Sequence, residues 1–257
     1  MKQAEAAVLF KALHVPGAPL VLFNAWDAGS AKVIERAGAA AIATGSWSVA
    51  AANGHADGEQ VPLAWVLENA RRIVAATTLP VSIDIESGYG ATAEEVARTM
   101  SQLVELGAVG CNLEDSHPAD GTLRTTRLQV ERIAAARRSV DRACPDFFIN
   151  ARTDMFFQRD AAMPDAARID AALERATAYA GAGANGIFVP GLVDERWIER
   201  FCLGSPLPVN VMMTSASPPL QRLANAGVAR VSHGPAPYRL AMAALHDAAI
   251  AALGATR

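Results

Sequence analysis

The chain has 257 residues, of which 51% are hydrophobic and 19% charged, and its formal net charge is −3. This composition can bury a large core, while the small net charge and the absence of a basic run argue against nucleic-acid binding. Three cysteines without a CxxC pair, no apolar run of about 18 residues and no signal-peptide pattern exclude a disulfide framework, a membrane span and a secretory leader. We therefore expect one cytoplasmic domain over residues 1–257.

Eight short apolar runs recur along the chain, and each ends in polar residues. They are rich in Val, Ile and Phe and do not alternate, as expected of strands that are buried on both faces of a parallel sheet. The predicted strands are Leu20–Trp26, Ala39–Ser46, Pro80–Glu86, Val109–Asp115, Phe147–Asp154, Gly186–Gly191, Val209–Met213 and Arg230–Gly234.

Stretches of helical length and period separate these strands. Clear examples are Leu63–Ala75, Glu94–Leu106, Leu128–Arg142 and Ala166–Ala180. Thr92 and Glu95 have the spacing of a capping box, and Ser217 before Pro218 predicts another helix start. Four glycines stand where a left-handed helix end is needed: Gly38, Gly107, Gly183 and Gly227. Eight alternating strands and helices predict an α/β fold, a (β/α)₈ barrel. A doubly wound open sheet is the alternative, but no GxGxxG follows the first strand.

Acidic residues gather at the ends of three consecutive predicted strands. In a barrel of this class the carboxyl ends of the strands form the mouth of the active site. Asp84 and Glu86 share one side of their strand by alternation, the next strand ends in Glu114 and Asp115, and the following one contains Arg152. Converging carboxylates are suited to Mg²⁺ or Mn²⁺. The alternative is a buried ion network with Arg152 and no metal.

The residues at and near the predicted strand ends also limit which reactions the protein can catalyse. Arg152 can bind a substrate carboxylate with two parallel hydrogen bonds, or it can form a structural salt bridge with Glu114. Asp57, in the segment after the second strand, has the character of an ordinary turn residue when it is considered alone. The only lysines are Lys2, Lys11 and Lys32, and none ends a predicted strand, which excludes a Schiff-base aldolase.

Taken together, these segments resemble the isocitrate lyase/phosphoenolpyruvate mutase superfamily along nearly the whole chain. Their order and spacing are more specific than any single segment. The segments are Ala43–Ser46, Asp57–Glu59, Asp84–Gly90, Glu114–Asp115, Ala151–Asp154 and Pro208–Met212. The resemblance implies a barrel enzyme that makes or breaks C–C or P–C bonds beside a carboxylate, through a metal-stabilised enolate.

The resemblance also implies roles for particular residues. Asp84 would bind Mg²⁺ directly, while Glu86 and Glu114 would hold its waters. Asp57 would belong to the same acidic group as a catalytic residue. The substrate would be bound by five residues: Gly45, Ser46, Trp47, Arg152 and Asn210.

The loop after the fourth strand departs from the superfamily. Lyase members have a Lys-Lys-Cys-Gly-His segment there, whereas residues 114–123 contain neither lysine nor cysteine. His117 in this loop is a candidate acid–base group, and an exposed loop histidine is the alternative. We therefore expect a Mg²⁺-dependent carbon–carbon lyase or decarboxylase of a small 2-oxo or 2-hydroxy carboxylate, with oxaloacetate-like substrates first.

Two other functions stay open at this stage. One is P–C bond chemistry of the phosphoenolpyruvate/phosphonopyruvate mutase type, and the other is a barrel that serves as a non-catalytic scaffold. The segment Tyr238–Leu253 is apolar around much of its circumference. The resemblance implies that this eighth barrel helix packs on a neighbouring subunit, in a homodimer or homotetramer.

Overall fold

The computed structural model of the protein describes residues 1–158 and 163–254. Eight parallel strands form one sheet in the order β1-β8-β7-β6-β5-β4-β3-β2. Each strand lies within the range predicted for it. Their bounds are Leu20–Leu22 (β1), Ile42–Ala43 (β2), Val81–Asp84 (β3), Gly110–Glu114 (β4), Phe148–Arg152 (β5), Gly186–Phe188 (β6), Val209–Met212 (β7) and Arg230–Ser232 (β8).

The sheet closes into a barrel at the join between β1 and β2. Ala25 and Thr44 form an isolated parallel bridge there. The amide of Ala25 donates to the carbonyl of Ala43 at 2.8 Å, and the amide of Gly45 donates back to the carbonyl of Ala25 at 3.3 Å. The predicted (β/α)₈ barrel is confirmed, and the open-sheet alternative is excluded by this closure.

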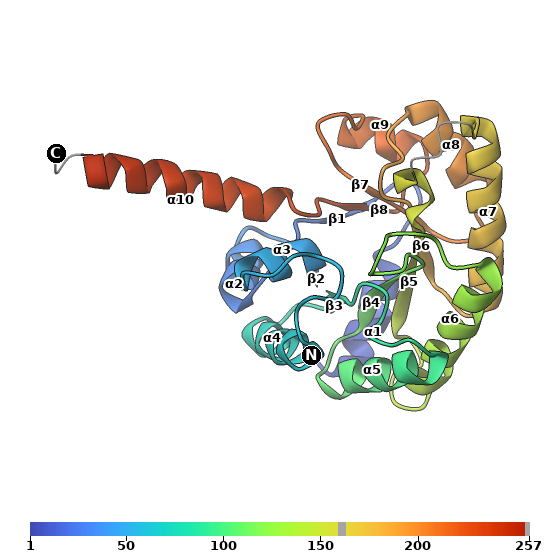
Figure 1. Cartoon of the computed structure of the whole chain (residues 1–257), viewed down its shortest axis with the longest axis horizontal. Coiled ribbons are helices and arrows are strands. Elements are labelled where there is room, and N and C mark those ends of the chain that lie inside the picture. Colours follow the sequence, from blue (N-terminus) through green and yellow to red (C-terminus); the bar gives the residue numbers. More distant parts are fainter. Residues whose placement is uncertain (159–162, 255–257) are drawn as a thin grey trace.

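Helices follow the strands around the outside of the barrel (Figure 1). The capping box at Thr92 is confirmed, since its side chain accepts from the amide of Glu95. The start predicted at Ser217 is wrong, because the Ser217 hydroxyl accepts from the amide of Thr214 at 2.9 Å in a turn instead. The helices are Gln3–Ala12 (α1), Ala28–Arg36 (α2), Ser46–Ala52 (α3), Leu63–Ala76 (α4), Ala93–Glu105 (α5), Thr126–Asp141 (α6), Asp154–Phe157 (the 3₁₀ turn η1), Asp165–Gly181 (α7), Glu195–Gly204 (α8), Leu220–Asn225 (α9) and Ala236–Gly254 (α10).

The amino-terminal end of the barrel is closed by α1 and the residues after it. Phe10 is fully buried and meets the ring of Phe148, the first residue of β5, at 5.7 Å between centroids. His14 stacks on the same ring at 3.9 Å. A Cβ atom at Gly110 would lie 2.9 Å from the Phe148 carbonyl, so only glycine fits beneath this plug. The open end of the barrel is therefore the carboxyl end of the strands.

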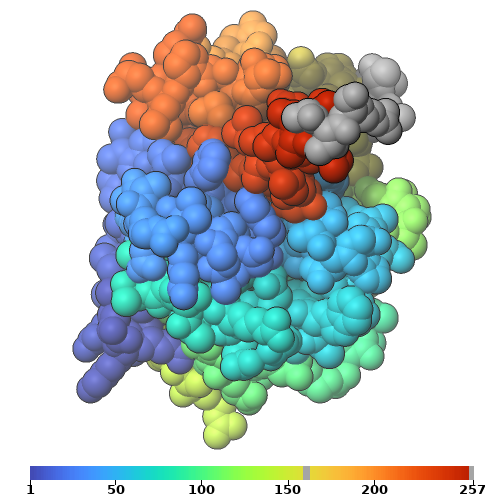
Figure 2. Space-filling view, turned by 90° about the vertical axis from the view of Figure 1, so that its left-hand side faces the viewer, coloured from blue at the N-terminus to red at the C-terminus, as the bar shows by residue number. Residues whose placement is uncertain are grey.

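The last helix, α10, leaves the barrel instead of covering it. In Figure 1 it extends sideways from β8, and in Figure 2 its atoms stand in front of the neighbouring surface. Val21 on β1 is 38% exposed, although barrel strands are normally covered by helices. No helix of the described residues is both long and apolar enough to cross a membrane.

Candidate active site

A cavity of about 230 Å³ opens at the carboxyl ends of the strands. Part of its wall is apolar, with Phe157, Phe188, Pro190 and Met212, and the remainder is polar. Six of the residues singled out in the sequence line it: Gly45, Ser46, Trp47, Asp57, Asp84 and Arg152. This position and this mixture of surfaces suit a small anionic ligand.

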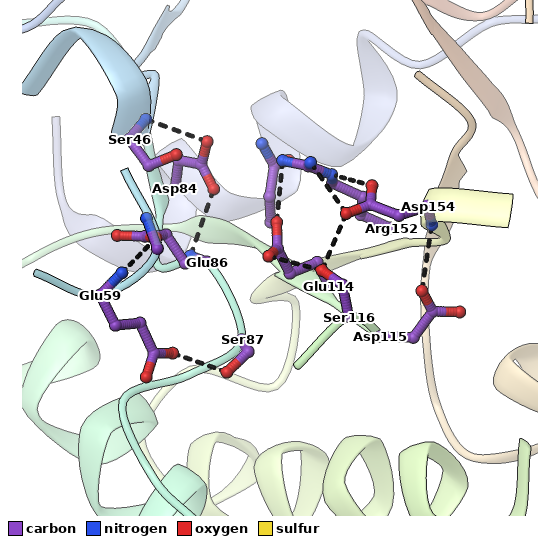
Figure 3. Close-up of polar contacts among 12 residues, drawn as sticks. Ser46, Glu59, Asp84, Glu86, Ser87, Glu114, Asp115, Ser116, Arg152 and Asp154 are labelled. Carbon is purple, nitrogen blue, oxygen red and sulfur yellow. Dashed lines mark hydrogen bonds and ion pairs between the residues drawn. The ribbon is translucent and has the colours of Figure 1, made fainter. Parts of the chain in front are cut away.

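Asp84 forms the acidic centre of the cavity. It ends β3, and its backbone amide donates to the hydroxyl of Thr44 at 2.8 Å, which ties it to the end of β2. Its carboxylate accepts from the amide of Ser46, the first residue of α3, at 3.1 Å (Figure 3). Gly45 caps α3 in an extended conformation. The turn from β2 into α3 therefore brings backbone N–H groups to the acidic side of the cavity.

Asp57 is positioned by two loops that hold each other. The Glu86 carboxylate accepts from the amides of Gly58 and Glu59 at 2.8 and 2.6 Å. In return, the Glu59 carboxylate accepts from the hydroxyl of Ser87 at 2.6 Å and from the amide of Tyr89 at 2.8 Å. We call these contacts the Glu59–Glu86 clamp. Asp57 lies at the cavity rim, immediately before the clamped amides.

The clamp imposes strain on the backbone. Among non-glycine residues of the described chain, only Glu59, Glu86 and Tyr89 have positive φ, at 57°, 52° and 53°. Each such residue costs roughly 1–2 kcal/mol, and strain of this kind persists where surrounding contacts enforce it. Because Glu86 lies in this turn, strand alternation no longer decides where its side chain points, and its carboxylate contacts the 57–59 loop. The Glu86 side chain does not line the cavity of about 230 Å³.

Arg152 forms part of the cavity wall and is ion-paired with two carboxylates. Its guanidinium contacts Glu114 at 2.8 Å and Asp154 at 2.6 Å, and the Ser116 hydroxyl bridges both carboxylates at 2.8 Å (Figure 3). The salt bridge with Glu114 expected as the alternative therefore exists, and Arg152 also lines the cavity. The salt-bridge interpretation is confirmed, and substrate binding by Arg152 stays a prediction with which its place in the cavity wall agrees.

Asparagines and one arginine form the floor beneath the cavity. Asn150 donates to the side-chain oxygens of Asn112 at 2.9 Å and Asn210 at 3.1 Å. Arg230, which is fully buried, donates to Asn112 at 3.2 Å. Asn210 was expected to line the pocket, but the expectation is wrong: it is 1% exposed, and its NH₂ group is bonded to the carbonyls of Val211 and Arg230 and to Ser232.

Burial and mutual repulsion perturb the carboxyl groups around Asp84. Burial raises the pKa of Glu86 to about 7, and the charges of Asp57 and Asp84 contribute. Partial desolvation at the cavity rim and the charge of Asp84 raise the pKa of Asp57. Burial also raises the pKa of Glu114, with Asp154 and Asp84 adding to the effect and Arg152 opposing it. The charge of Asp84 thus opposes ionisation of three other carboxyl groups.

This electrostatic pattern fits a divalent cation at Asp84. A positive charge there would favour ionisation of all three neighbours. No group of three or more His, Cys, Asp or Glu side chains within residues 1–158 and 163–254 is arranged to hold a metal directly. Mg²⁺ needs no such group, since it commonly keeps several waters and binds one or two carboxylates plus substrate oxygens. Asp84 would hold the ion, and its chemistry would be that of a hydrated Mg²⁺ or Mn²⁺.

His117 lies apart from this arrangement. Its side chain is exposed, and the loop around it is folded on itself, with its amide donating to the carbonyl of Thr122 at 2.8 Å. It does not line the cavity. The exposed-loop interpretation agrees with this position, while the acid–base role stays a prediction without structural support.

Several residues of the site were not singled out in the sequence. Asn24, Asn112 and Ser232 line the cavity, and Glu59 holds the clamp. A signal for Asn112 did exist, because it stands two residues before Glu114 and shares its side of the strand. For Asn24, which follows β1, and Ser232, which ends β8 near the other end of the sequence, nothing local marks the site.

Comparisons with known proteins point to one group of enzymes. The profile of the phosphoenolpyruvate phosphomutase family matches residues 10–253. A solved structure of a candidate phosphonomutase from Burkholderia cenocepacia J2315 is 54% identical, with a TM-score of 0.93 and coverage of 98% of this chain and 99% of that one. The 2-methylisocitrate lyase of Escherichia coli K12 is 32% identical over 81% of this chain and 71% of its own length. A phosphonopyruvate hydrolase, solved with oxalate and Mg²⁺, is 25% identical, with a TM-score of 0.83 over 99% and 88% of the chains.

Proposed function

Since this chain belongs to the phosphoenolpyruvate phosphomutase family, within the isocitrate lyase/phosphoenolpyruvate mutase superfamily, we propose that it is a Mg²⁺-dependent carbon–carbon lyase or decarboxylase. Its substrate would be a small 2-oxo or 2-hydroxy carboxylate. Oxaloacetate-like acids come first, because they can lose a carbon fragment without the catalytic cysteine that the 114–123 loop lacks. The non-catalytic alternative has no observation in its favour.

One observation carries this proposal. Around a cavity of about 230 Å³, the charge of Asp84 opposes ionisation of Asp57, Glu86 and Glu114, while Arg152 stands on the same cavity wall. A cation held at Asp84 would relieve that repulsion and attract the oxygens of a chelating carboxylate. A bound Mg²⁺ would supply Lewis-acid stabilisation of negative charge that develops on the substrate.

The residues of the chain then have separate tasks. Arg152 and the first-turn amide of Trp47 orient the carboxylate of the substrate, while the Ser46 amide holds Asp84. Asp57 has a raised pKa and stands at the rim, where it can exchange a proton with the substrate carbon. Phe157, Phe188 and Pro190 limit water on the opposite side.

Calorimetry with oxalate, a mimic of the planar enolate of a 2-oxo acid, tests the proposal. We expect oxalate to bind in the presence of Mg²⁺ and to lose most of its affinity when Mg²⁺ is removed or in the Asp84→Ala variant. Arg175→Lys is the matched control, since Arg175 pairs with Asp115 at 3.0 Å outside the cavity. Oxalate binding that is indifferent to both the metal and Asp84 would refute the function.

P–C bond chemistry is the second candidate, and it is favoured by the 54% identity with a candidate phosphonomutase. The two functions are separated by turnover. Release of CO₂ or of a carbon fragment from oxaloacetate supports the lyase, whereas turnover of phosphonopyruvate alone supports the mutase class.

We also propose that the protein is a homo-oligomer joined through α10. Four large apolar residues of this helix are at least half exposed: Leu240, Leu245, Ile250 and Leu253. A helix that is apolar around its circumference and leaves its own barrel requires another protein surface. The uncovered side of β1 at Val21 offers such a surface on a second copy.

A further inference from the structure

The floor of the cavity contains an amide group whose orientation is fixed from behind. Asn112 lines the cavity and is paired in register with Asp84 on the neighbouring strand. Its side-chain oxygen accepts from Asn150 at 2.9 Å and from Arg230 at 3.2 Å. A guanidinium can only donate hydrogen bonds, so this atom must be the oxygen, and the NH₂ group must face away from Arg230.

That NH₂ group has no partner within residues 1–158 and 163–254. Some polar atoms without a partner are also fully shielded from solvent, such as Arg230 Nη1 and His14 Nε2. Asn112 Nδ2 is not one of these shielded atoms. The nitrogen of Asn112 therefore reaches open space, and the open space that Asn112 lines is the cavity. We propose that Asn112 is a substrate-contacting residue that donates a hydrogen bond to an anionic oxygen of the bound carboxylate; this assignment rests on the proposed function.

The positive charge of Arg230 behind Asn112 favours an anionic ligand at the Asn112 side chain. Arg230 forms no ion pair with a carboxylate in the described part of the chain, whereas Arg152 is paired with both Glu114 and Asp154. Donation from Arg230 polarises the Asn112 amide and strengthens its N–H groups as donors. An NH₂ group cannot coordinate a cation. Asp84 and Asn112, side by side across two strands, thus divide the floor into a cation half and an anion half.

The supporting hydrogen bonds make this donor rigid. Asn210 is held by three groups of β7 and β8, the carbonyls of Val211 and Arg230 and the hydroxyl of Ser232. It also accepts from Asn150, which in turn donates to Asn112. A donor that is fixed before the ligand arrives requires no reorganisation on binding. The chain of amides explains why Asn210 matters to the site without lining it.

The test is the Asn112→Asp variant. Aspartate keeps an acceptor for Asn150 and Arg230, so the fold is retained, but it replaces the N–H donor with an anionic oxygen. We expect the affinity for oxalate in the presence of Mg²⁺ to fall about 10- to 100-fold. Affinity for Mg²⁺ alone should be unchanged or higher, because another carboxylate stands beside Asp84. General damage to the fold would weaken both.

Asn185→Asp is the matched control. Asn185 stands just before β6, at the end of the barrel opposite the cavity, and its side-chain oxygen likewise accepts from an arginine, Arg137, at 3.2 Å, and from the amide of Ile149 at 2.9 Å, so the variant keeps both acceptor contacts. We expect its oxalate affinity to stay within about twofold of the parent. A neutral variant, Asn112→Ser, adds no charge and replaces the NH₂ group with a hydroxyl on a shorter side chain that reaches less far into the cavity, and it should still lose about tenfold.

The outcomes are separable. If the parent protein binds no oxalate with Mg²⁺, the proposed function fails and the role of Asn112 fails with it. If the parent binds oxalate but Asn112→Asp matches Asn185→Asp, or Asn112→Ser matches the parent, only the role of Asn112 is overturned. Loss of both oxalate and Mg²⁺ binding in Asn112→Ser, with its circular dichroism intact, also overturns it.

Discussion

The amide of Glu59 donates to the carboxylate of Glu86 at 2.6 Å, and the carboxylate of Glu59 accepts from the amide of Tyr89, three residues beyond Glu86. Each glutamate therefore binds the backbone of the loop that carries the other. The two loops form one unit, and Asp57 is held at the cavity rim by that unit.

Removal of one half of the clamp should release Asp57. We expect Glu59→Ala to lower the free energy of unfolding by about 1–3 kcal/mol, because the Ser87 hydroxyl and Tyr89 amide lose their acceptor. Urea denaturation measures this loss, and oxalate calorimetry measures the weakened site. Glu59→Gln is the control, since its amide oxygen can accept from both donors and should preserve most of the affinity. Equal behaviour of the two variants would contradict the clamp.

The buried carboxyl of Glu86 predicts a pH dependence for the metal-free protein. Its pKa is raised from 4.5 to about 7, so between these values the folded state keeps a proton that the unfolded state has released. The contribution of Glu86 to stability is therefore lost as pH rises through this window, with a slope of at most about 1.4 kcal/mol per pH unit. Urea denaturation in a chelator, from pH 5 to pH 8, measures it.

Glu86→Gln isolates this contribution. Glutamine can accept from Gly58 and Glu59 with its oxygen and donate to the Tyr89 hydroxyl, so its fold should be retained. The difference between parent and variant removes the opposite trend of buried His14, whose pKa is lowered to about 3 mainly by burial. A difference that does not vary with pH would contradict the shift at Glu86.

Arg152 cannot be replaced by another cation. Lysine lacks the planar fork that contacts Glu114 and Asp154 together, so Arg152→Lys should reduce the oxalate affinity by about 100-fold and the stability by about 1–3 kcal/mol. Calorimetry and thermal unfolding measure the two effects. The control Arg175→Lys breaks a buried pair elsewhere and should affect stability alone. Full affinity in Arg152→Lys would show that the guanidinium is only structural.

The exposed position of His117 predicts a small effect. We expect His117→Gln to change kcat on the identified substrate by less than about twofold, as for other surface substitutions. Steady-state kinetics measures this. A loss of kcat of tenfold or more, without a change in KM, would restore the acid–base role that the sequence suggested.

Assembly through α10 predicts a change of mass. The double variant Leu240→Glu and Leu245→Glu places charges on the projecting helix, and we expect it to be monomeric in analytical ultracentrifugation, whereas the parent is not. Leu203→Glu on α8 is the control, because Leu203 is 82% exposed at another site and should leave the assembly intact. A monomeric parent at micromolar concentration would rule out the assembly.

The sequence predicted which strand-end residues line the cavity, because in this fold the residues at the carboxyl ends of the strands face the active-site opening. Asp84 and Arg152 follow apolar runs, and both line the cavity. Glu86 did not follow the same logic, since the chain turns to positive φ at this residue. His117 shows a second limit: a titratable side chain in a loop carries no signal of where the loop folds.

The network beneath the cavity was harder to predict. Asn112, Asn150 and Arg230 come from three strands, and their hydrogen bonds depend on the stagger of the barrel, which local patterns do not contain. The superfamily resemblance supplied Asn210 without its partners. The resemblance also implied that the last helix packs on a neighbouring subunit, and α10 does leave its own barrel (Figure 1); its packing on a second copy stays a proposal.

The closure of the barrel between Ala25 and Thr44 has a thermodynamic consequence. This join has only one bridge, and the cavity residues Asn24 and Ser46 stand on either side of it. A ligand that contacts residues on both the β1 side and the β2 side adds an interaction across this weakly paired join. Occupancy of the cavity by ligand and local separation of β1 from β2 are then linked equilibria. Ligand binding therefore also stabilises the closed barrel.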